Sequence, residues 1–403
     1  MKILHTLAQL PAKTGSGVYY SSMIEGLKKY NHEQKAIFAD QDEYDWGVLP
    51  SEDQYRVTFK SEELPFPIVG MSDVMAYEST KYSSMTDEVM DVWKQAFKSR
   101  LMKIKENFEP DIIFAHHLWI LTSVVREVFT QTKIIGICHN TDLRQSRMNI
   151  KLKDNHANKI HKLDYIFSIS DQQKHDIIEL YGAHKEKIIT VGGGFNQDIF
   201  YFPKEKRCSE KVRLVFCGKI DPSKGLYELI EVYRSLGLED LTLDIIGNPD
   251  RENKVKLKEY IKDDVSINVY DAIEQTELGD ELRKKDIFIM PSFYEGVALM
   301  AIESLACGLY VVTTEIEALM SLLGKEIEKS GIIKYVPLPR IYDTDKPVKE
   351  DLAKFKDDLK QAILSQIKKV RDKQEVHEEM EDKIKTFSWE RMVSNMNNII
   401  NSI

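Results

Sequence analysis

Two glutamates, Glu295 and Glu303, lie eight residues apart in the segment PSFYEGVALMAIESLACG, which begins at Pro291. On one continuous helix, eight steps of about 100° would leave the two side chains about 80° apart, so they would not share a face. The segment instead has the pattern of a strand, a turn and a helix. We therefore expect Glu295 on the turn and Glu303 two turns into the helix, both directed into one cleft.

Carboxylates at these two positions suit the binding of sugar hydroxyls. A carboxylate accepts two hydrogen bonds from neighbouring hydroxyls, so Glu303 suits a ribose and Glu295 suits a second sugar. The helix N-terminus after Gly296 also offers unpaired N–H groups to an anion. The alternative is two acids on a solvated helix, where a glutamate merely complements the helix dipole. The buried strand and the glycines before the helix disfavour that alternative.

Two lysines, Lys219 and Lys224, follow a second strand-like run in the segment LVFCGKIDPSKG. Two cations at the carboxyl end of a strand, beside the start of a helix, suit a diphosphate. Most lysines in polar loops are simply solvated, and without further context that alternative is favoured.

A glycine-containing segment near the N-terminus could also approach an anion. We expect a strand that ends near Gln9, a loop with Gly15, Ser16 and Gly17, and a helix that begins around Val18. Glycines let the backbone come close to a ligand, and a helix N-terminus attracts negative charge. The segment is not G-x-G-x-x-G and carries no Walker lysine, so a plain tight turn is an equally good interpretation.

Three histidines follow strand-like runs in the first half of the chain. His139 comes after Ile134–Cys138, and His116 and His117 come after Ile112–Ala115. Ligands of open α/β sheets bind at the carboxyl ends of the strands, which favours a functional role. A lone histidine is more often structural, so the sequence leaves both interpretations open.

The elements that must position these residues alternate between strand-like and helix-like runs, which predicts an α/β protein with parallel sheets. The other expected strands are Ile3–Ala8, Tyr165–Ile169, Ile188–Val191, Val212–Phe216, Leu241–Ile246, Ile267–Tyr270, Ile287–Met290 and Tyr310–Thr313. The expected helices run from Leu226 to a stop at Gly237, around Met90–Ile104, from about Ala298 to Cys307, and after a cap at Ser388.

The length of 403 residues is sufficient for two domains. We expect a first domain over residues 1–203, a second over 204–385 and a C-terminal helix over 386–403, with residues 198–211 as the polar linker. An insertion at about residues 43–107 interrupts the first domain. It could form a wall of the site or serve ordinary packing.

Composition excludes some functions and locations. The net charge of −9 gives no reason to expect nucleic acid as a partner. Cys138, Cys208, Cys217 and Cys307 form no C-x-x-C pair, which argues against a disulfide framework or a zinc site. With no signal-peptide pattern and no apolar run of about 18 residues, we expect a cytoplasmic protein. Peripheral contact with the inner face of a membrane and the oligomeric state stay open.

Taken together, these segments resemble the retaining GT-B glycosyltransferases of family 4, over nearly the whole chain except residues 43–107. The most specific part is the E-x7-E element of Glu295 and Glu303, inside PS-x-x-EG and ES-x-ACG. Next come Gly218-Lys219 and Lys224-Gly225, which match the family's GR and KG. Weaker similarities are the GSG near the start, the histidine at 139 and FSW before the C-terminal helix.

The resemblance implies two Rossmann-like domains that face each other across a cleft, with the C-terminal helix crossing back to the first. It implies transfer of a sugar from a UDP- or GDP-sugar to an acceptor sugar, lipid-linked glycan or small metabolite, with retention of configuration and with no metal or cofactor. On this basis His139, Glu295 and Lys224 are catalytic, and we place His116 and His117 on the acceptor side. The expected donor-binding residues are Gly15, Ser16, Gly17, Gly218, Lys219, Lys224, Gly247, Tyr270, Ala272, Glu295, Gly296, Val297, Ala298, Leu299 and Glu303.

The chain departs from the family pattern at several positions. Lys219 stands in place of an arginine, which keeps the charge but loses the bidentate fork. Ala298 stands where a second glycine is usual, GGGFN replaces PNG, and Asp271 stands at a position that is commonly glycine. These differences concern the identity of the donor more than the fold.

Three other functions are consistent with parts of the pattern. One is a non-catalytic partner subunit that keeps the fold and only binds nucleotide or another transferase. A second is a nucleotide-sugar 2-epimerase, which has the same two-domain architecture. The third, a nicotinamide oxidoreductase, would need the G-x-G-x-x-G fingerprint that this chain lacks.

Overall fold

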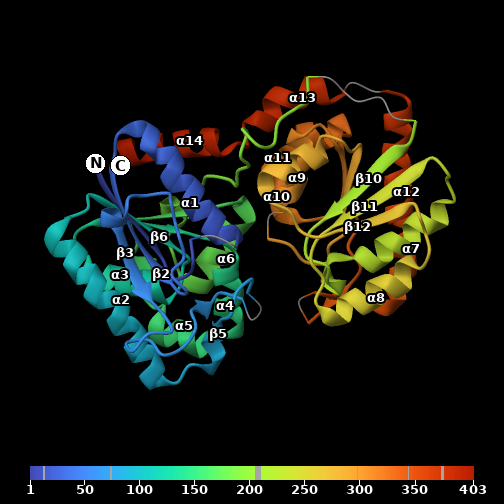
Figure 1. The fold of residues 1–403 in the computed structure, drawn as a ribbon. Coiled ribbons are helices and arrows are strands. Elements are labelled where there is room, and N and C mark those ends of the chain that lie inside the picture. Colours follow the sequence, from blue (N-terminus) through green and yellow to red (C-terminus); the bar gives the residue numbers. More distant parts are fainter. Residues whose placement is uncertain (12–13, 73–74, 205–209, 297, 344, 374–375) are drawn as a thin grey trace. The chain divides into compact units, whose positions relative to one another are not determined.

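The computed structural model describes residues 1–11, 14–72, 75–204, 210–296, 298–343, 345–373 and 376–403. By their contacts the residues form two compact units, Met1–Gly192 with Met392–Ile403, and Gly193–Arg391. Each unit contains an open parallel sheet with helices on both faces (Figure 1). The predicted α/β class with two Rossmann-like domains is thereby confirmed.

In the first unit, the sheet has the order β3-β2-β1-β6-β7-β8-β9, and every neighbouring pair is parallel. Its strands are β1 (Lys2–Leu7), β2 (Glu33–Asp40), β3 (Gln54–Thr58), β6 (Ile112–His116), β7 (Lys133–Ile137), β8 (Tyr165–Ser168) and β9 (Ile188–Thr190). Because β1 pairs with both β2 and β6, the order of the strands reverses between β1 and β6. Ligands of such sheets bind at the carboxyl ends of the strands beside this reversal.

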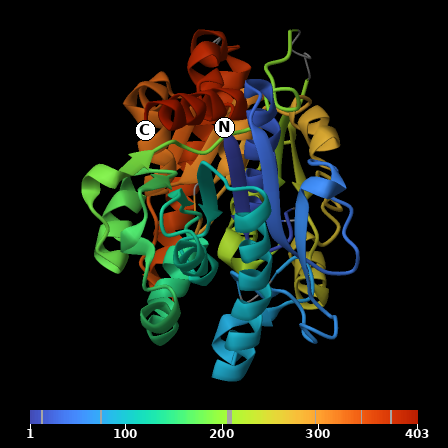
Figure 2. The ribbon, with the colours of Figure 1, turned by 90° about the vertical axis from the view of Figure 1, so that its left-hand side faces the viewer.

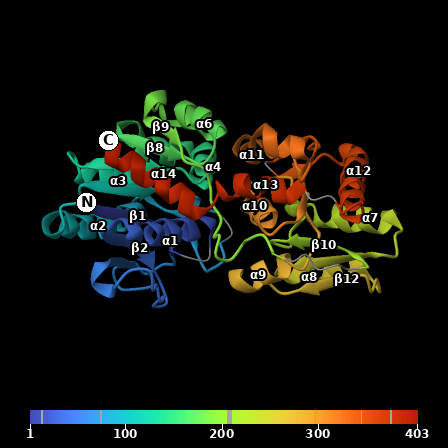
Figure 3. The ribbon, with the colours of Figure 1, turned by 90° about the horizontal axis from the view of Figure 1, so that it is seen from above.

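The helices of the first unit are α1 (Gly15–Leu27), α2 (Asp87–Asn107, cyan in Figure 2), α3 (Ile120–Val128), α4 (Thr141–Met148), α5 (Ile150–His156) and α6 (Asp171–Tyr181). A short parallel pair, β4 (Val69–Gly70) and β5 (Thr80–Lys81), lies between β3 and α2 in the chain. The C-terminal helix α14 (Trp389–Ser402) runs along α1 in Figure 3. There Val393 packs on Gly26, and His32 Nε2 forms a hydrogen bond with Asn397 Oδ1 at 2.8 Å.

In the second unit, the sheet has the order β12-β11-β10-β13-β14-β15, with the corresponding reversal between β10 and β13. Its strands are β10 (Val212–Cys217), β11 (Leu241–Ile246), β12 (Ile267–Tyr270), β13 (Ile287–Met290), β14 (Tyr310–Thr314) and β15 (Ile333–Val336). All residues of β13 and β14 are buried, as expected for strands covered on both faces. A small antiparallel pair, β16 (Ile341–Tyr342) and β17 (Lys346–Pro347), follows.

The helices of the second unit are α7 (Leu226–Leu236), α8 (Arg251–Ile261), α9 (Gln275–Leu282), α10 (Leu299–Ala306), α11 (Glu317–Ser330), α12 (Leu352–Arg371) and α13 (Val376–Lys385). Gly237 adopts φ +62° and ends α7, as predicted. Ser388 caps α14, since its hydroxyl accepts a hydrogen bond from the Arg391 N–H at 3.3 Å. The ten strands expected from the sequence are all present.

Three strands of the two main sheets were missing from the sequence prediction. The strand β2 has its apolar run only in its second half, after a charged beginning, and β15 is only four residues long. The edge strand β3, QYRVT, is largely polar and lies inside the expected insertion at residues 43–107. The first part of that insertion therefore contributes to the main sheet.

The units divide at different residues from the expected boundaries at 203 and 386. Phe195 and Phe200 are buried in the core of the second unit, and the N–H of Phe195 donates to the Phe387 carbonyl at 3.3 Å. Part of the expected linker therefore packs with the second unit. At the other end, residues 386–391 also group with the second unit, and residues 392–403 group with the first.

Candidate active site

In the second unit, the loops after β10 and β13 are in direct backbone contact. The N–H of Phe293 donates to the carbonyl of Ser223 at 2.8 Å. Gly225 adopts φ +63°, and a Cβ at this position would overlap the carbonyl oxygen of Pro291. Only glycine fits this close approach, which fixes the two loops together on either side of the strand reversal.

This loop contact brings together Lys224 and Glu295, two of the residues predicted to be catalytic. Lys224 Nζ lies 2.8 Å from Glu295 Oε1 and donates to the Tyr294 carbonyl at 3.3 Å. The hydroxyl of Ser292 also donates to Glu295 Oε1, at 3.0 Å. The side chains of Lys224 and Glu295 are only 24% and 20% exposed. Lys224 and Glu295 therefore form a partly buried ion pair beyond the carboxyl ends of the central strands β10 and β13.

The other predicted phosphate-binding residues lie at the ends of β10 and β11. Gly218 has φ +155°, and a Cβ at Gly247 would overlap its carbonyl oxygen. Lys219 is 53% exposed, and its Nζ lies 3.4 Å from Asp221 Oδ2. Asp221 in turn caps the short helical turn Pro222–Lys224 by accepting from the Ser223 N–H at 2.9 Å.

Glu303 lies in the second turn of α10, and Glu295 precedes the helix, as predicted from their spacing. The side chain of Glu303 is 8% exposed, and burial raises its pKa to about 7. None of the described residues forms a hydrogen bond with its carboxylate. Cys217, the last residue of β10, has a pKa raised to about 12, first by burial and then by the negative charge of Glu303. Glu303 therefore lies near the carboxyl end of β10 with unused acceptor capacity.

The backbone before α10 has a left-handed residue. Ala298 has φ +59° and ψ +53° and is buried directly before Leu299, the first residue of the helix. A left-handed conformation costs about 1–2 kcal/mol for a residue other than glycine. This geometry accounts for the glycine that is usual at this position. The predicted Val297 lies outside the described residues.

Tyr270 and Ala272, two of the predicted donor-binding residues, lie at the end of β12 and just after it, at the edge of the sheet. The half-exposed ring of Tyr270 lines a pocket of about 510 Å³ together with Ile246. Asn248, which the sequence analysis did not single out, holds the loop because its Oδ1 accepts from the Ala272 N–H at 2.9 Å.

In the first unit, the three predicted histidines meet at the ends of β6 and β7. His116 Nδ1 and His139 Nε2 are 3.0 Å apart, and the ring of His117 lies 4.7 Å from that of His139. Burial lowers the pKa of His117 to about 3 and holds the pKa values of the other two well below the usual range. All three are therefore neutral near pH 7. His117 is also in a left-handed conformation, with φ +68°.

Asp142 positions these histidines, although the sequence analysis did not identify it. Its buried carboxylate accepts from the backbone N–H groups of Leu118 at 2.7 Å, His139 at 3.2 Å and Leu143 at 3.1 Å. Leu118 follows β6 and His139 follows β7, so one side chain connects the two strand ends. Burial raises the pKa of Asp142, and its backbone hydrogen bonds oppose that change.

The segment with Gly15, Ser16 and Gly17 corrects a prediction. These residues form the first turn of α1 rather than a loop before it. Thr14 caps the helix by accepting from the Gly17 N–H at 3.1 Å, so the helix begins three residues earlier than expected. Next in the helix, Tyr20 packs edge-on against His116, with 4.9 Å between the ring centroids.

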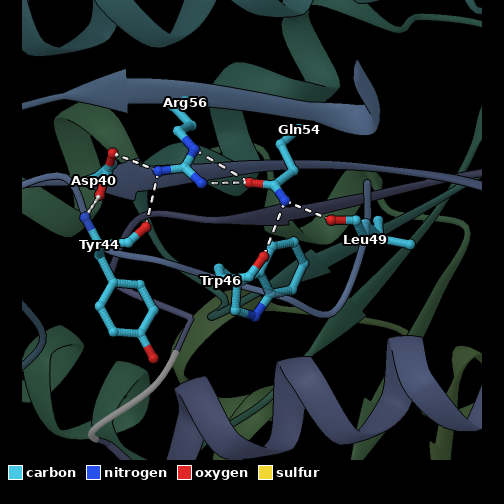
Figure 4. A network of polar contacts seen from close by, with 6 residues as sticks. All are labelled: Asp40, Tyr44, Trp46, Leu49, Gln54 and Arg56. Atoms are coloured by element: carbon cyan, nitrogen blue, oxygen red, sulfur yellow. Dashed lines mark hydrogen bonds and ion pairs between the residues drawn. The ribbon is translucent and has the colours of Figure 1, made fainter. Parts of the chain in front are cut away.

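A polar network anchors the loop between β2 and β3 (Figure 4). The Arg56 guanidinium donates to Asp40 at 3.2 Å, to the Tyr44 carbonyl at 2.8 Å and to Gln54 at 2.8 Å. Gln54 also donates to the Trp46 carbonyl at 3.0 Å. The ring centroid of Trp46 lies 5.7 Å from that of Tyr20, and Tyr20 in turn contacts His116. This part of the insertion therefore serves packing that supports the histidines.

Two further observations concern metal ions and membranes. The described residues contain no group of three or more His, Cys, Asp or Glu side chains that could hold a metal ion. Within the same residues, no helix combines the length and apolar character needed to cross a bilayer.

Several known proteins are similar to this chain. Curated relatives include the D-inositol 3-phosphate glycosyltransferases of Streptomyces bingchenggensis, 27% identical over 177 residues (39% of each chain), and of Streptosporangium roseum, 22% identical over 272 residues (59% of this chain and 61% of the relative). The match thus spans less than two thirds of the length of these relatives.

Solved structures match over the whole chain. The sucrose-phosphate synthase of Thermosynechococcus elongatus has a TM-score of 0.72 at 14% identity and covers 100% of this chain and 99% of its own. Anabaena Alr3699/HepE, solved in complex with UDP, has a TM-score of 0.67 at 13% identity and covers 100% of both chains. At such identities these structures establish the fold, which is GT-B.

Two family profiles match adjacent parts of the chain. The profile of "Glycosyl transferases group 1" matches residues 198–337, and that of "Glycosyltransferase Family 4" matches residues 89–198. Together the matched ranges extend over more than half of the chain and include Lys224, Glu295, Glu303 and the three histidines. The chain therefore belongs to the family-4 glycosyltransferases.

Proposed function

We propose that this protein transfers a hexosyl group from a UDP- or GDP-sugar to an acceptor, with retention of the anomeric configuration and without a metal ion. The observation that carries the proposal is the buried carboxylate of Glu303. It has no hydrogen-bond partner among the described residues and lies near the end of β10, whose loop carries Lys224. A carboxylate that has lost most of its water and has no donor among these residues is costly to ionise unless a ligand supplies a donor.

The donor would be bound by residues of the second unit. Lys219 and Lys224 would hold the diphosphate, whose negative charge grows as the bond to the sugar breaks. Glu303 would accept from the two hydroxyls of the ribose, and Glu295 from the hydroxyls of the transferred sugar. The first N–H groups of α10 would face the same anion.

The acceptor would be bound by residues of the first unit. His139 would lie beside the sugar, and His116 and His117 would contact the acceptor. Because each ring is neutral, it has one nitrogen that can donate a hydrogen bond to a hydroxyl and one that can accept a hydrogen bond from a hydroxyl. We assign no separate nucleophile among the residues that the structure describes, so attack on the same face as the leaving diphosphate is the expected route. We expect the reaction to take place in the cytoplasm, with or without contact to the membrane.

The comparisons suggest which substrates to test first. A protein of this fold has been solved with UDP-glucose, so UDP-sugars are the first donors. The curated relatives are named as D-inositol 3-phosphate glycosyltransferases, so an inositol phosphate is the first acceptor to test.

A thermal-shift panel of UDP-, GDP-, ADP- and TDP-sugars tests the proposal. A ligand at 100 times its dissociation constant stabilises the folded state by about 2.7 kcal/mol, which such an assay detects easily. With the donor that this panel selects, NMR of the product should show that the anomeric configuration is retained. The rate of sugar transfer should be unchanged when EDTA is added.

The products separate the proposal from its alternatives. Free nucleotide with an epimerised sugar in the absence of acceptor would indicate an epimerase. Binding without turnover for every acceptor tried would indicate a non-catalytic subunit. No binding of any nucleotide sugar would refute the proposal.

A further inference from the structure

Both cations proposed to bind the diphosphate already have a carboxylate partner in the free protein. Lys219 pairs with Asp221, and Lys224 pairs with Glu295. Solvent screens the first pair more strongly, because Lys219 is 53% exposed whereas both members of the second pair are partly buried. Lys224 Nζ already donates to Glu295 and to the Tyr294 carbonyl, so a diphosphate that takes more than the one remaining N–H competes with Glu295.

The two acids differ in how firmly they are held. Asp221 is fixed by the N–H and the hydroxyl of Ser223, at 2.9 and 2.7 Å. Glu295 likewise receives two hydrogen bonds on one oxygen, Oε1, but one of them comes from Lys224 itself and only the other, from Ser292, is independent of that lysine. Its other oxygen has no partner among the residues that the structure describes. Glu295 is thus the acid that can exchange its partner when a ligand arrives.

A nucleotide sugar and a bare nucleoside diphosphate affect this ion pair differently. The nucleotide sugar brings phosphates for Lys224 and hydroxyls for the freed carboxylate of Glu295. The nucleoside diphosphate brings phosphates only, and leaves a partly buried carboxylate beside added negative charge. That arrangement is unfavourable, because a carboxylate removed from its cation loses the partner that offset its desolvation.

We propose that Glu295 is a specificity-determining residue that makes the site reject the spent nucleoside diphosphate relative to the intact nucleotide sugar. The inference rests on the proposed function, and it adds that the Lys224–Glu295 ion pair re-forms when the sugar has left. Re-formation of the pair competes with the diphosphate for Lys224 and so promotes product release.

The test compares dissociation constants for wild type, Glu295→Gln and a control. The amide keeps the shape of Glu295 and an acceptor for Lys224, but removes the charge. Glu231→Gln is the matched control, because Glu231 on α7 also lies 2.8 Å from a lysine, Lys356, and is 44% exposed. Calorimetry is run with inorganic pyrophosphate, with the nucleoside diphosphate of the donor that the panel selects, and with that donor itself.

We expect Glu295→Gln to bind pyrophosphate and the nucleoside diphosphate about three- to tenfold more tightly than wild type, and to bind the nucleotide sugar more weakly. The control should change none of the three constants. General damage to the site would weaken all of them, so opposite changes are the signature of the exchange.

Weaker or unchanged binding of the nucleoside diphosphate by Glu295→Gln would overturn the inference while leaving the proposed function intact. Failure of wild type to bind any nucleotide would instead overturn the proposed function and the inference with it. Equal tightening of the diphosphate and the nucleotide sugar would also overturn the inference, since Glu295 would then not distinguish them.

Discussion

The buried carboxylate of Glu303 predicts an unusual dependence of stability on pH. Burial raises its pKa from 4.5 to about 7 in the folded state. Between these values the folded protein binds the proton that the unfolded chain has already released. The contribution of Glu303 to stability is therefore largest below pH 4.5 and is lost as the pH rises through about 7. The full change from 4.5 to about 7 corresponds to about 3 kcal/mol.

Replacement of Glu303 by glutamine removes this titration and keeps the shape of the side chain. The buried amide adds a cost of its own, but that cost does not depend on pH. Relative to wild type, the variant should gain about 2.5 kcal/mol of stability between pH 5 and pH 8. For a unit of about 200 residues, this is a relative gain of about 5–10 °C in Tm.

Calorimetric unfolding of wild type, Glu303→Gln and Glu231→Gln at pH 5, 6, 7 and 8 measures this gain. Glu231→Gln controls for the loss of one charge at an exposed position. Curves of wild type and Glu303→Gln that run parallel from pH 5 to pH 8 would refute the argument, because they would mean that Glu303 titrates normally.

The same residue links pH to ligand binding. If the ribose hydroxyls donate to the carboxylate of Glu303, the bound form must be ionised. Binding near pH 7 should then release about half a proton, which calorimetry in two buffers of different ionisation enthalpy detects. The variant should release none, and it should bind pyrophosphate as wild type does, since pyrophosphate has no ribose.

Three further substitutions test other parts of the site. Lys224→Ala should cost about 2–4 kcal/mol of transition-state stabilisation, which steady-state kinetics will show as a fall in kcat/KM. Gly225→Ala should destabilise the second unit by more than about 1 kcal/mol and lower its Tm, because Gly225 has a positive φ and a Cβ would overlap Pro291. Gly15→Ala is the control, and it should not lower Tm, because a Cβ at this helical position meets open space. Asp142→Ala should destabilise the first unit by about 2–4 kcal/mol, measured by urea unfolding, because three backbone N–H groups lose their acceptor.

Much of the donor side could be predicted from the sequence because its signals are local. The apolar run before Pro291 predicts a buried strand, and the glycine after Glu295 predicts a turn. Together they place Glu295 before the helix and Glu303 within it, as the structure does. Whether the two carboxylates face one cleft stays a prediction.

Other features depend on contacts between distant segments and so could not be predicted. The Lys224–Glu295 ion pair joins residues 71 positions apart, and it forms only because β10 and β13 are neighbours in the sheet. Asp142 has an ordinary sequence context, and its role requires the loop after β6 to lie beside the loop after β7. The predicted start of α1 was wrong for a different reason. Gly15 and Gly17 indicated a loop, but the cap that Thr14 provides allows both glycines to be helical.

Three energetically costly features of this protein lie at or after the carboxyl ends of its strands. Ala298 and His117 have left-handed backbones at the ends of β13 and β6, and Glu303 is buried near the end of β10 at a cost of about 3 kcal/mol above pH 7. Folding alone gives no reason to keep a left-handed residue or an unpaired carboxylate at the end of a strand, because each could be relieved by one substitution. Such costs are expected where a ligand repays them, at the edge where open α/β sheets bind their ligands. Within the second unit, Ala298 and Glu303 thus support the same donor site as the motifs, on physical grounds of their own.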